Sequence, residues 1–394
     1  MITIDFGTWS ERDFAAKTMT GGGLNFSDTR LVKSEGETVF EMFGRKSAGC
    51  RVKFFESLED AAAGNVYRIS VRVKLGETCS VDSADVAVGV IGMFALQPAF
   101  LCEPQTVTKN EWCKIEFTYT MTDDSHNALS VEQRGNGTPL AESIVVGGIE
   151  TEALFKAEKK EVADDRKTLW IIGDSIACNY SPSVVTKGWG MYIGEHLNEK
   201  RIKVCNMARA GLSTQSFINT DGLAIWTCVC KQMRAGDYLI VSLGINDFGS
   251  SLPERRTTKE QYRENLCAFA EEAHHRGVIM LFITSTVTVD RNPVDNYRRG
   301  FLETMIDAAK EKRELGYDVS YIDLNAHMFG EIQKIESNDG YEYLVDTFYS
   351  YSQTSDGTIK RDTTHHREAG SRWVASMISE LVRENDSSLK EFLK

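Results

Sequence analysis

The chain has 394 residues, of which 42% are hydrophobic, and it carries a formal net charge of −12. This length exceeds one typical domain and predicts two, and the composition is that of a folded globular protein rather than a disordered or fibrous one. The acidic balance argues against a nucleic-acid or anionic-membrane partner and is compatible with a neutral substrate such as a sugar. No apolar run approaches the roughly 18–20 residues that span a bilayer.

Cysteine usage and the start of the chain bear on the cellular compartment. The nine cysteines are scattered and include no C-x-x-C pair, so we expect buried free thiols and no zinc ribbon. Residues 1–6 lack a basic segment followed by an apolar core. We therefore expect, by a slight preference, a cytoplasmic protein. A secreted protein whose signal segment has been removed is the alternative.

The first 155 residues are rich in alternating, β-branched segments. Val66–Leu75 and Cys113–Met121 alternate apolar and polar residues as half-buried strands do. Further strands are expected at Asp85–Val90, Ala128–Glu132 and Ser143–Glu150. With no convincing helix among these strands, the pattern predicts a β-sandwich over residues 1–155.

This strand pattern, with Trp112 before a strand and Val145–Glu150 at its end, loosely resembles the jelly-roll modules of carbohydrate-active enzymes. The resemblance implies either a sugar-binding domain or a structural accessory domain. We favour the accessory domain, because aromatic residues in strands pack in the core by default. Residues 156–167 are highly charged and almost without apolar side chains, which predicts a solvated linker, with a salt-bridged helical turn as the alternative.

Residues 168–394 alternate between apolar, strand-like runs and helical patterns. The expected strands are Thr168–Ile172, Ile202–Asn206, Tyr238–Leu243, Val278–Thr284 and Val319–Asp323. The expected helices are Trp189–Asn198, Thr214–Met233, Lys259–Arg276, Asn296–Glu314, Leu324–Ile335 and one after Ala369. This alternation predicts an α/β domain whose parallel sheet has helices on both faces. The carboxyl ends of its strands then meet at one edge, where such sheets carry their active sites.

Residues with catalytic chemistry follow three of these strands and precede the last helix. Ser175 follows the first strand, Gly211 the second and Asn246 the third, and Asp362 and His365 come before the helix. A serine hydroxyl needs a base, which His365 can provide, and Asp362 can fix the tautomer of that histidine. The backbone N–H groups of Ser175 and Gly211 and the side-chain amide of Asn246 are the expected oxyanion donors.

Four blocks match, in order and spacing, those of the SGNH (GDSL-type) hydrolase superfamily. They are Gly173-Asp-Ser175, Gly211, Gly244-x-Asn246-Asp247 and Asp362-x-x-His365. Over about residues 168–385 the chain looks like the rhamnogalacturonan acetylesterase branch of that superfamily. The segments that carry this finer resemblance are Gly188–Gly190, Gly236–Val241 and Asp362–Gly370.

The resemblance implies a three-layer αβα fold and removal of acetyl groups from plant polysaccharides, with no cofactor. It implies that Ser175 is the nucleophile, His365 the base and Asp362 the group that orients the base. Gly211 and Asn246 would complete the oxyanion hole. The expected partner is an acetylated oligo- or polysaccharide, with no nucleic acid and no membrane, and the oligomeric state is open.

Other polar side chains near this edge are candidates for substrate contact. They are Asp174, Arg291, Tyr349 and Tyr351, the last two from a Tyr-rich segment at 341–351 that we expect to be a loop. For Asp174, a role in ordering the surrounding loops is favoured. His366 competes with His365 as the base, but its spacing to Asp362 is less suitable.

Metal chemistry and two other functions are alternatives to an acetylesterase. A metal site formed by Asp174, Asp247, Asp362 and His365 is not expected, because the loop after the third strand offers no histidine ligand. A lipase or thioesterase on the same scaffold would need an apolar acyl channel. A sugar-binding protein with a catalytically weak hydrolase domain is the alternative from a different class.

Overall fold

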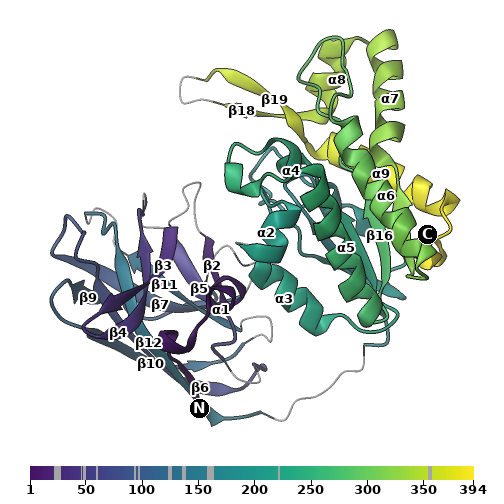
Figure 1. The fold of residues 1–394 in the computed structure, drawn as a ribbon. Helices are drawn as coiled ribbons and strands as arrows, with labels where there is room; N and C mark the ends of the chain where they lie inside the picture. The colour runs from purple at the N-terminus through teal and green to yellow at the C-terminus, as the bar shows by residue number, and fades with distance from the viewer. Residues whose placement is uncertain are drawn as a thin grey trace. The chain divides into compact units, whose positions relative to one another are not determined.

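The computed structural model divides into two compact units, Met1–Val162 and Ala163–Lys394 (Figure 1). It describes residues 1–394 except 22–27, 46, 48–49, 59–60, 93–94, 96–97, 123–126, 135–138, 158–163, 221 and 354–356. The central part of the predicted linker, residues 158–163, therefore lies outside the described residues. None of the helices in the described part of the chain is long and apolar enough to cross a membrane.

The first unit is built from two antiparallel sheets. One sheet has the order β10-β6-β12-β4-β3, with β1 beside β12. Its strands are β1 (Ile2–Ile4), β3 (Asp28–Ser34), β4 (Glu37–Phe43), β6 (Val66–Leu75), β10 (Cys113–Thr120) and β12 (Ile144–Phe155). The other sheet has the order β2-β5-β11-β7-β8, with β9 beside β7. Its strands are β2 (Thr18–Gly21), β5 (Arg51–Phe54), β7 (Ser83–Ile91), β8 (Phe100–Leu101), β9 (Gln105–Thr108) and β11 (Ala128–Arg134).

Both sheets contribute to one hydrophobic core, which makes this unit a β-sandwich, as predicted. Val71 and Val73 of β6 and Val86 and Val88 of β7 all belong to that core, because alternate residues of a strand point to the same face. The absence of a helix was wrongly predicted, since α1 (Glu11–Lys17) follows β1 and begins with a capping box. Two turns of helix are too short to give a clear periodicity in the sequence.

The second unit contains a parallel sheet that, within the described residues, has five strands in the order β14-β13-β15-β16-β17. The strands are β13 (Lys167–Gly173), β14 (Ile202–Asn206), β15 (Tyr238–Ser242), β16 (Ile279–Ile283) and β17 (Val319–Ile322). Each lies within one or two residues of the strand predicted from the sequence. Buried strands of a parallel sheet are continuous apolar runs, which makes them easy to find.

Helices cover both faces of this sheet, which gives the predicted three-layer αβα fold. The helices are α2 (Thr214–Asn219), α3 (Leu223–Gln232), α4 (Ile245–Gly249), α5 (Lys259–His275), α6 (Arg299–Glu314), α7 (Leu324–Asn338), α8 (Tyr341–Phe348) and α9 (Glu368–Glu384). Helices α7, α8 and α9 share a core with one face of the sheet. Helices α2, α3, α5 and α6 pack in series on one another on the other face.

Some local predictions for this unit were wrong. The helix predicted at Trp189–Asn198 is a pair of 3-10 turns, η2 (Trp189–Met191) and η3 (Ile193–His196). The helix predicted at Thr214–Met233 is divided into α2 and α3. The Tyr-rich segment is not a loop, because it forms α8 and then β18 (Tyr349–Gln353), which pairs with β19 (Ile359–His366) in an antiparallel hairpin.

A buried carboxylate holds the amino ends of two central strands together. Asp237, just before β15, accepts hydrogen bonds from the Thr168 backbone N–H at 2.9 Å, Trp170 Nε1 at 3.2 Å and the Arg234 backbone N–H at 3.0 Å. Only 4% of Asp237 is exposed. A buried carboxylate is tolerated when its oxygens accept several hydrogen bonds, as they do here.

We expect Asp237→Ala to lower the free energy of unfolding by about 3 kcal/mol, because it leaves buried N–H donors without an acceptor. Denaturant unfolding, followed by tryptophan fluorescence and circular dichroism, measures the change. Asp307→Ala, which removes an exposed carboxylate on α6, is the control and should change the value by less than about 0.5 kcal/mol. Equal effects of the two substitutions would contradict the anchoring role of Asp237.

Candidate active site

Ser175 lies in the turn that follows β13, the strand with a parallel neighbour on each side. β14 and β15 flank β13, so the loops that follow both strands emerge beside this turn. Ser175 is 8% exposed, and its carbonyl oxygen accepts a hydrogen bond from the Tyr180 hydroxyl at 3.0 Å. The turn is thus held in place while a small part of the serine reaches the surface.

His365 links Ser175 to Asp362 through hydrogen bonds at both ring nitrogens. Nε2 lies 2.8 Å from Ser175 Oγ, and Nδ1 lies 2.7 Å from Asp362 Oδ2. The pairing of β18 with β19 shifts register here, so that residues 363–365 bulge out of the hairpin. Asp362 Oδ1 accepts the backbone N–H groups of Thr364 and His365, both at 3.0 Å. One carboxylate oxygen thus fixes the bulge and the other fixes the imidazole.

This contact shifts the pKa values of both groups. Burial alone lowers the pKa of His365, but the hydrogen bond to Asp362 and its negative charge outweigh burial, so the pKa lies above its ordinary value of 6.5. Burial alone raises the pKa of Asp362, but bonds from the imidazole and from backbone N–H groups lower it to about 2. Asp362 is therefore ionised at neutral pH and stabilises an imidazolium.

His366 points away from this group. It is 1% exposed and packs against the Tyr349 ring, with the ring centroids 4.9 Å apart. Burial lowers its pKa to about 3, assisted by the charge of His365. A neutral ring in the core cannot compete with His365 for a proton.

Besides Ser175 itself, two predicted oxyanion residues come from the loops on either side of the Ser175 turn. Gly211, in the loop after β14, has a φ of 82°, which a residue with a side chain rarely adopts. Among the described residues, the backbone N–H groups of Ser175 and Gly211 have no hydrogen-bond acceptor. Asn246, at the start of α4, donates one Nδ2 hydrogen to the Leu212 carbonyl oxygen at 2.9 Å. Its second N–H remains available to a ligand.

Asp174 and Asp247 are buried beneath the site. Asp174 is 1% exposed, its Oδ1 accepts the Ile176 backbone N–H at 2.9 Å, and burial raises its pKa to about 6. Asp247 is completely buried, and burial raises its pKa to about 7 although hydrogen bonds from Thr214 act in the opposite direction. The predicted substrate contact of Asp174 is not supported, because its side chain is covered and orders the Ser175 turn.

The other three residues predicted to contact substrate differ in burial and in the partners of their side chains. They are Tyr349, Arg291 and Tyr351. Tyr349 is fully buried and donates its hydroxyl to the Val287 carbonyl oxygen at 2.8 Å, so that prediction was wrong and the ring is a packing residue. Arg291 forms an ion pair with Asp295 at 2.6 Å and stacks on the Tyr297 ring, 4.0 Å from its centroid. Tyr351 is half-buried on β18, with the Arg367 guanidinium 5.1 Å from its ring centroid, and its contact with substrate stays a prediction.

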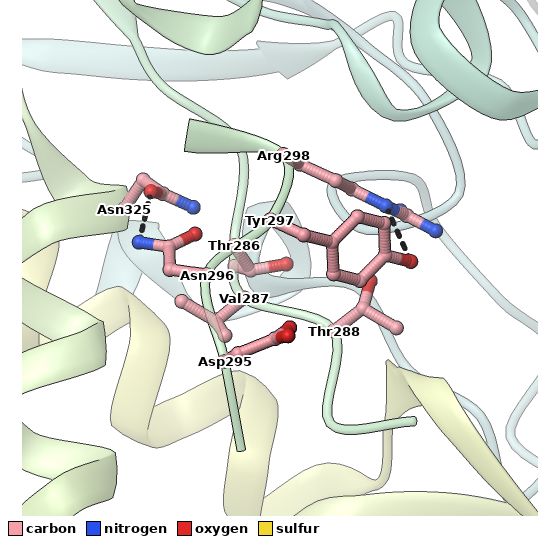
Figure 2. Close-up of a pocket in the computed structure, with 8 residues that line it drawn as sticks. All are labelled: Thr286, Val287, Thr288, Asp295, Asn296, Tyr297, Arg298 and Asn325. Atoms are coloured by element: carbon pink, nitrogen blue, oxygen red, sulfur yellow. Dashed lines mark hydrogen bonds between the residues drawn. The ribbon is translucent and has the colours of Figure 1, made fainter. Parts of the chain in front are cut away.

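Two residues at this edge were not found from the sequence. Phe248 on α4 is 40% exposed, two residues after Asn246, and Phe301 supports it edge-on with a centroid distance of 5.5 Å. Arg298 donates Nε to the Tyr297 hydroxyl at 3.1 Å (Figure 2) and has no ion-pair partner among the described residues. The signal for Phe248 was its place directly after the Gly244–Asp247 block. Nothing in the sequence distinguished Arg298 from the paired Arg291 and Arg299.

No group of three or more His, Cys, Asp or Glu side chains that could hold a metal ion occurs within the described residues. The arrangement that is present, a hydroxyl, an imidazole and a carboxylate in a hydrogen-bonded chain, can carry out nucleophilic acyl transfer.

Comparisons with known proteins identify relatives among esterases. The chain is 27% identical over 227 residues to a probable rhamnogalacturonan acetylesterase, YesY, of Bacillus subtilis, covering 57% of this chain and 95% of that protein. It is 29% identical over 84 residues to the rhamnogalacturonan acetylesterase of Emericella nidulans, covering 21% of this chain and 30% of that protein. The crystal structure of the Bacillus subtilis protein YxiM is similar with a TM-score of 0.47 and 18% identity, covering 93% of this chain and 88% of that one.

A family model described as GDSL-like lipase/acylhydrolase matches residues 171–373, more than half of the chain. The match begins in β13 and ends in α9, so it contains the Ser175 turn, both neighbouring loops and the His365 bulge. The chain therefore belongs to the GDSL-like lipase/acylhydrolase family and is a carboxylic ester hydrolase.

Proposed function

We propose that this protein is a serine esterase that removes O-acetyl groups from carbohydrates through an acetyl-serine intermediate. The observation that carries the proposal is the hydrogen-bonded chain from Ser175 Oγ through His365 to Asp362, with distances of 2.8 and 2.7 Å. The choice of an acetylated carbohydrate is supported by the two relatives that are named rhamnogalacturonan acetylesterases.

In the first half of the reaction, Ser175 Oγ attacks the acetyl carbonyl carbon while His365 Nε2 takes the hydroxyl proton. The carbonyl oxygen becomes an oxyanion, which accepts hydrogen bonds from the Ser175 and Gly211 N–H groups and from Asn246 Nδ2. The ionised Asp362 stabilises the imidazolium. The C–O bond to the sugar then breaks, and the leaving oxygen takes the proton from His365.

In the second half, His365 removes a proton from water, which attacks the carbonyl carbon of acetyl-Ser175. The same donors stabilise the second oxyanion. Breakage of the acyl C–O bond releases acetate, and His365 returns the proton to Ser175 Oγ.

Two exposed apolar side chains follow Asn246 closely in the chain and bear on the kind of ligand. They are Phe248 and Leu252, which are 40% and 42% exposed. The supported ring of Phe248 offers a flat apolar surface next to Asn246, which suits the C–H face of a sugar ring. A lipase acting on longer acyl esters would place its acyl chain on the same surface, so acyl-chain preference separates the two functions.

We expect the purified protein to release acetate from at least one acetylated pectin, xylan or mannan oligosaccharide. Ser175→Ala should abolish the release, and Asn246→Ala should lower kcat by roughly 10²–10³ because one oxyanion donor is lost. Acetate is measured enzymatically, together with hydrolysis of nitrophenyl esters of two to twelve carbons. A rate that peaks at eight carbons or more would identify a lipase instead.

We also expect kcat/KM for nitrophenyl acetate to fall about tenfold per pH unit on the acid side, because only the neutral imidazole can act as base. The midpoint of this fall in kcat/KM should lie above pH 6.5, since the contact with Asp362 raises the pKa of His365. Asp362→Asn removes the negative charge that raises the pKa of His365, so the midpoint should move to lower pH. The same substitution should lower kcat by about 10³–10⁴. Asp346→Asn, an exposed carboxylate on α8, is the control. If Asp362→Asn left the midpoint of the pH profile unchanged, the pairing of His365 with Asp362 would be ruled out.

The β-sandwich carries a candidate for a second function, the binding of glycan. A cleft of about 650 Å³ lies on the outer face of the sheet that contains β6 and β12, with Trp112 in its wall. Three cationic and three anionic side chains line it, namely Lys33, Arg72, Lys114, Asp5, Glu37 and Glu150. This balanced charge favours a neutral ligand rich in hydroxyl groups, and the volume lies within the range of small-ligand sites.

In the Ser175→Ala protein, which cannot consume its ligand, we expect Trp112→Ala to weaken oligosaccharide binding about tenfold. Isothermal titration calorimetry measures the affinity, and the melting temperature tests whether the sandwich stays folded. Phe155→Ala, at an exposed aromatic position at the end of β12, is the matched control. Equal affinities for the two variants would exclude this cleft as the glycan site.

A further inference from the structure

An arginine outside the Ser–His–Asp group holds the loop that carries Gly211. Arg255, the last residue of the turn η4 (Pro253–Arg255), donates Nη1 to the Gly211 carbonyl oxygen at 2.8 Å. A side-chain carbon added to Gly211 would collide with this nitrogen. The guanidinium thus occupies the space beside Gly211 that a side chain would fill.

The next carbonyl along the chain is held in the same way. Asn246 Nδ2 donates to the Leu212 carbonyl oxygen at 2.9 Å. Two side chains from the segment after β15 therefore hold two successive carbonyl groups of the loop after β14. The φ and ψ of Gly211 connect these carbonyl groups to the Gly211 N–H, and a glycine backbone is unusually free about both angles. Hydrogen bonds that hold the two carbonyl groups therefore limit the conformations that Gly211 can adopt.

Asp247 completes the connection between the two loops. Its buried carboxylate accepts the Thr214 backbone N–H at 3.1 Å and the Thr257 hydroxyl at 3.3 Å. The Thr257 backbone N–H in turn donates to the Asp247 carbonyl oxygen at 3.0 Å. Two hydrogen bonds therefore hold Thr257 against Asp247, and Arg255, two residues before Thr257, extends from this held segment to the Gly211 loop.

We propose that Arg255 is a positioning residue, which aims the Gly211 N–H at the oxyanion by holding the Gly211 carbonyl oxygen. The inference rests on the proposed oxyanion hole, and adds a residue to it that touches neither the substrate nor the reacting atoms. An oxyanion donor acts only when it is preorganised, because reorientation during the reaction costs part of the stabilisation. Arg255 supplies this preorganisation through a charged hydrogen bond, which is stronger than a neutral one.

The neighbouring arginine provides a matched control. Arg256 Nε donates to the Ser250 carbonyl oxygen at 2.6 Å, so it too binds a backbone carbonyl from the same segment. Its bond lies within the loop after β15 and does not reach the loop after β14. Substitution of either arginine removes a guanidinium–carbonyl bond, and the Arg255 bond is to a predicted oxyanion residue, whereas the Arg256 bond is to Ser250.

With nitrophenyl acetate as substrate, we expect Arg255→Ala to lower kcat about tenfold with little change in KM, and Arg256→Ala to leave both parameters near those of the wild type. Arg255→Lys should retain an intermediate kcat, since an ammonium group can donate to one carbonyl but lacks the planar fork. Millimolar guanidinium chloride should restore part of the activity of Arg255→Ala and none in Arg256→Ala. Melting temperatures of all variants are measured in parallel.

The double variant Arg255→Ala/Asn246→Ala adds a second readout. Because both side chains hold the same loop, its loss in kcat should be smaller than the product of the single losses. Equal losses in Arg255→Ala and Arg256→Ala, or a change in KM alone, would overturn the proposal. A wild-type protein that hydrolyses nitrophenyl acetate but no acetylated glycan would refute the proposed substrate and leave this test intact.

Discussion

The active edge depends on the position of β13 between two parallel neighbours. Because β14 lies on one side of it and β15 on the other, the Ser175 turn has a loop on each flank, and each loop carries one of the proposed oxyanion residues. Neither Gly211 nor Asn246 is near Ser175 in the sequence. The order of strands in the sheet, rather than any local motif, therefore creates the surroundings that an attacking serine needs.

Buried carboxylates hold the second unit together at both ends of its parallel sheet, and each has a separate task. Asp237 joins the amino ends of two strands, Asp247 joins the two oxyanion loops, and Asp174 orders the turn of the serine. Asp362 differs from these three because its side chain is hydrogen-bonded to an imidazole, a group that can take up a proton. The cost of burying these groups is offset by hydrogen bonds from backbone N–H groups, which do not move when the imidazole titrates.

The sequence was most informative where a pattern had one structural solution. Apolar runs located the strands of the parallel sheet, and the Ser175, Asn246 and His365 blocks were found because strand ends gather at one edge. The side-chain direction of a residue such as Tyr349 could not be predicted, since an aromatic residue in a polar segment can face the core or the solvent. Arg291 and Arg298 look alike in sequence, and only the packed loop shows which one has a carboxylate partner.

The bulge in β19 separates His365 from the regularly paired part of the hairpin. Asp362 Oδ1 closes residues 363–365, and the Val289 backbone N–H holds the same bulge by donating to the Thr363 carbonyl oxygen at 2.9 Å. The paired segment beyond Ser350 and Asp362 runs in regular register to Gln353 and Ile359. Because the bonds that close the bulge lie outside this segment, a change at the outer end of the hairpin leaves the contacts of His365 in place.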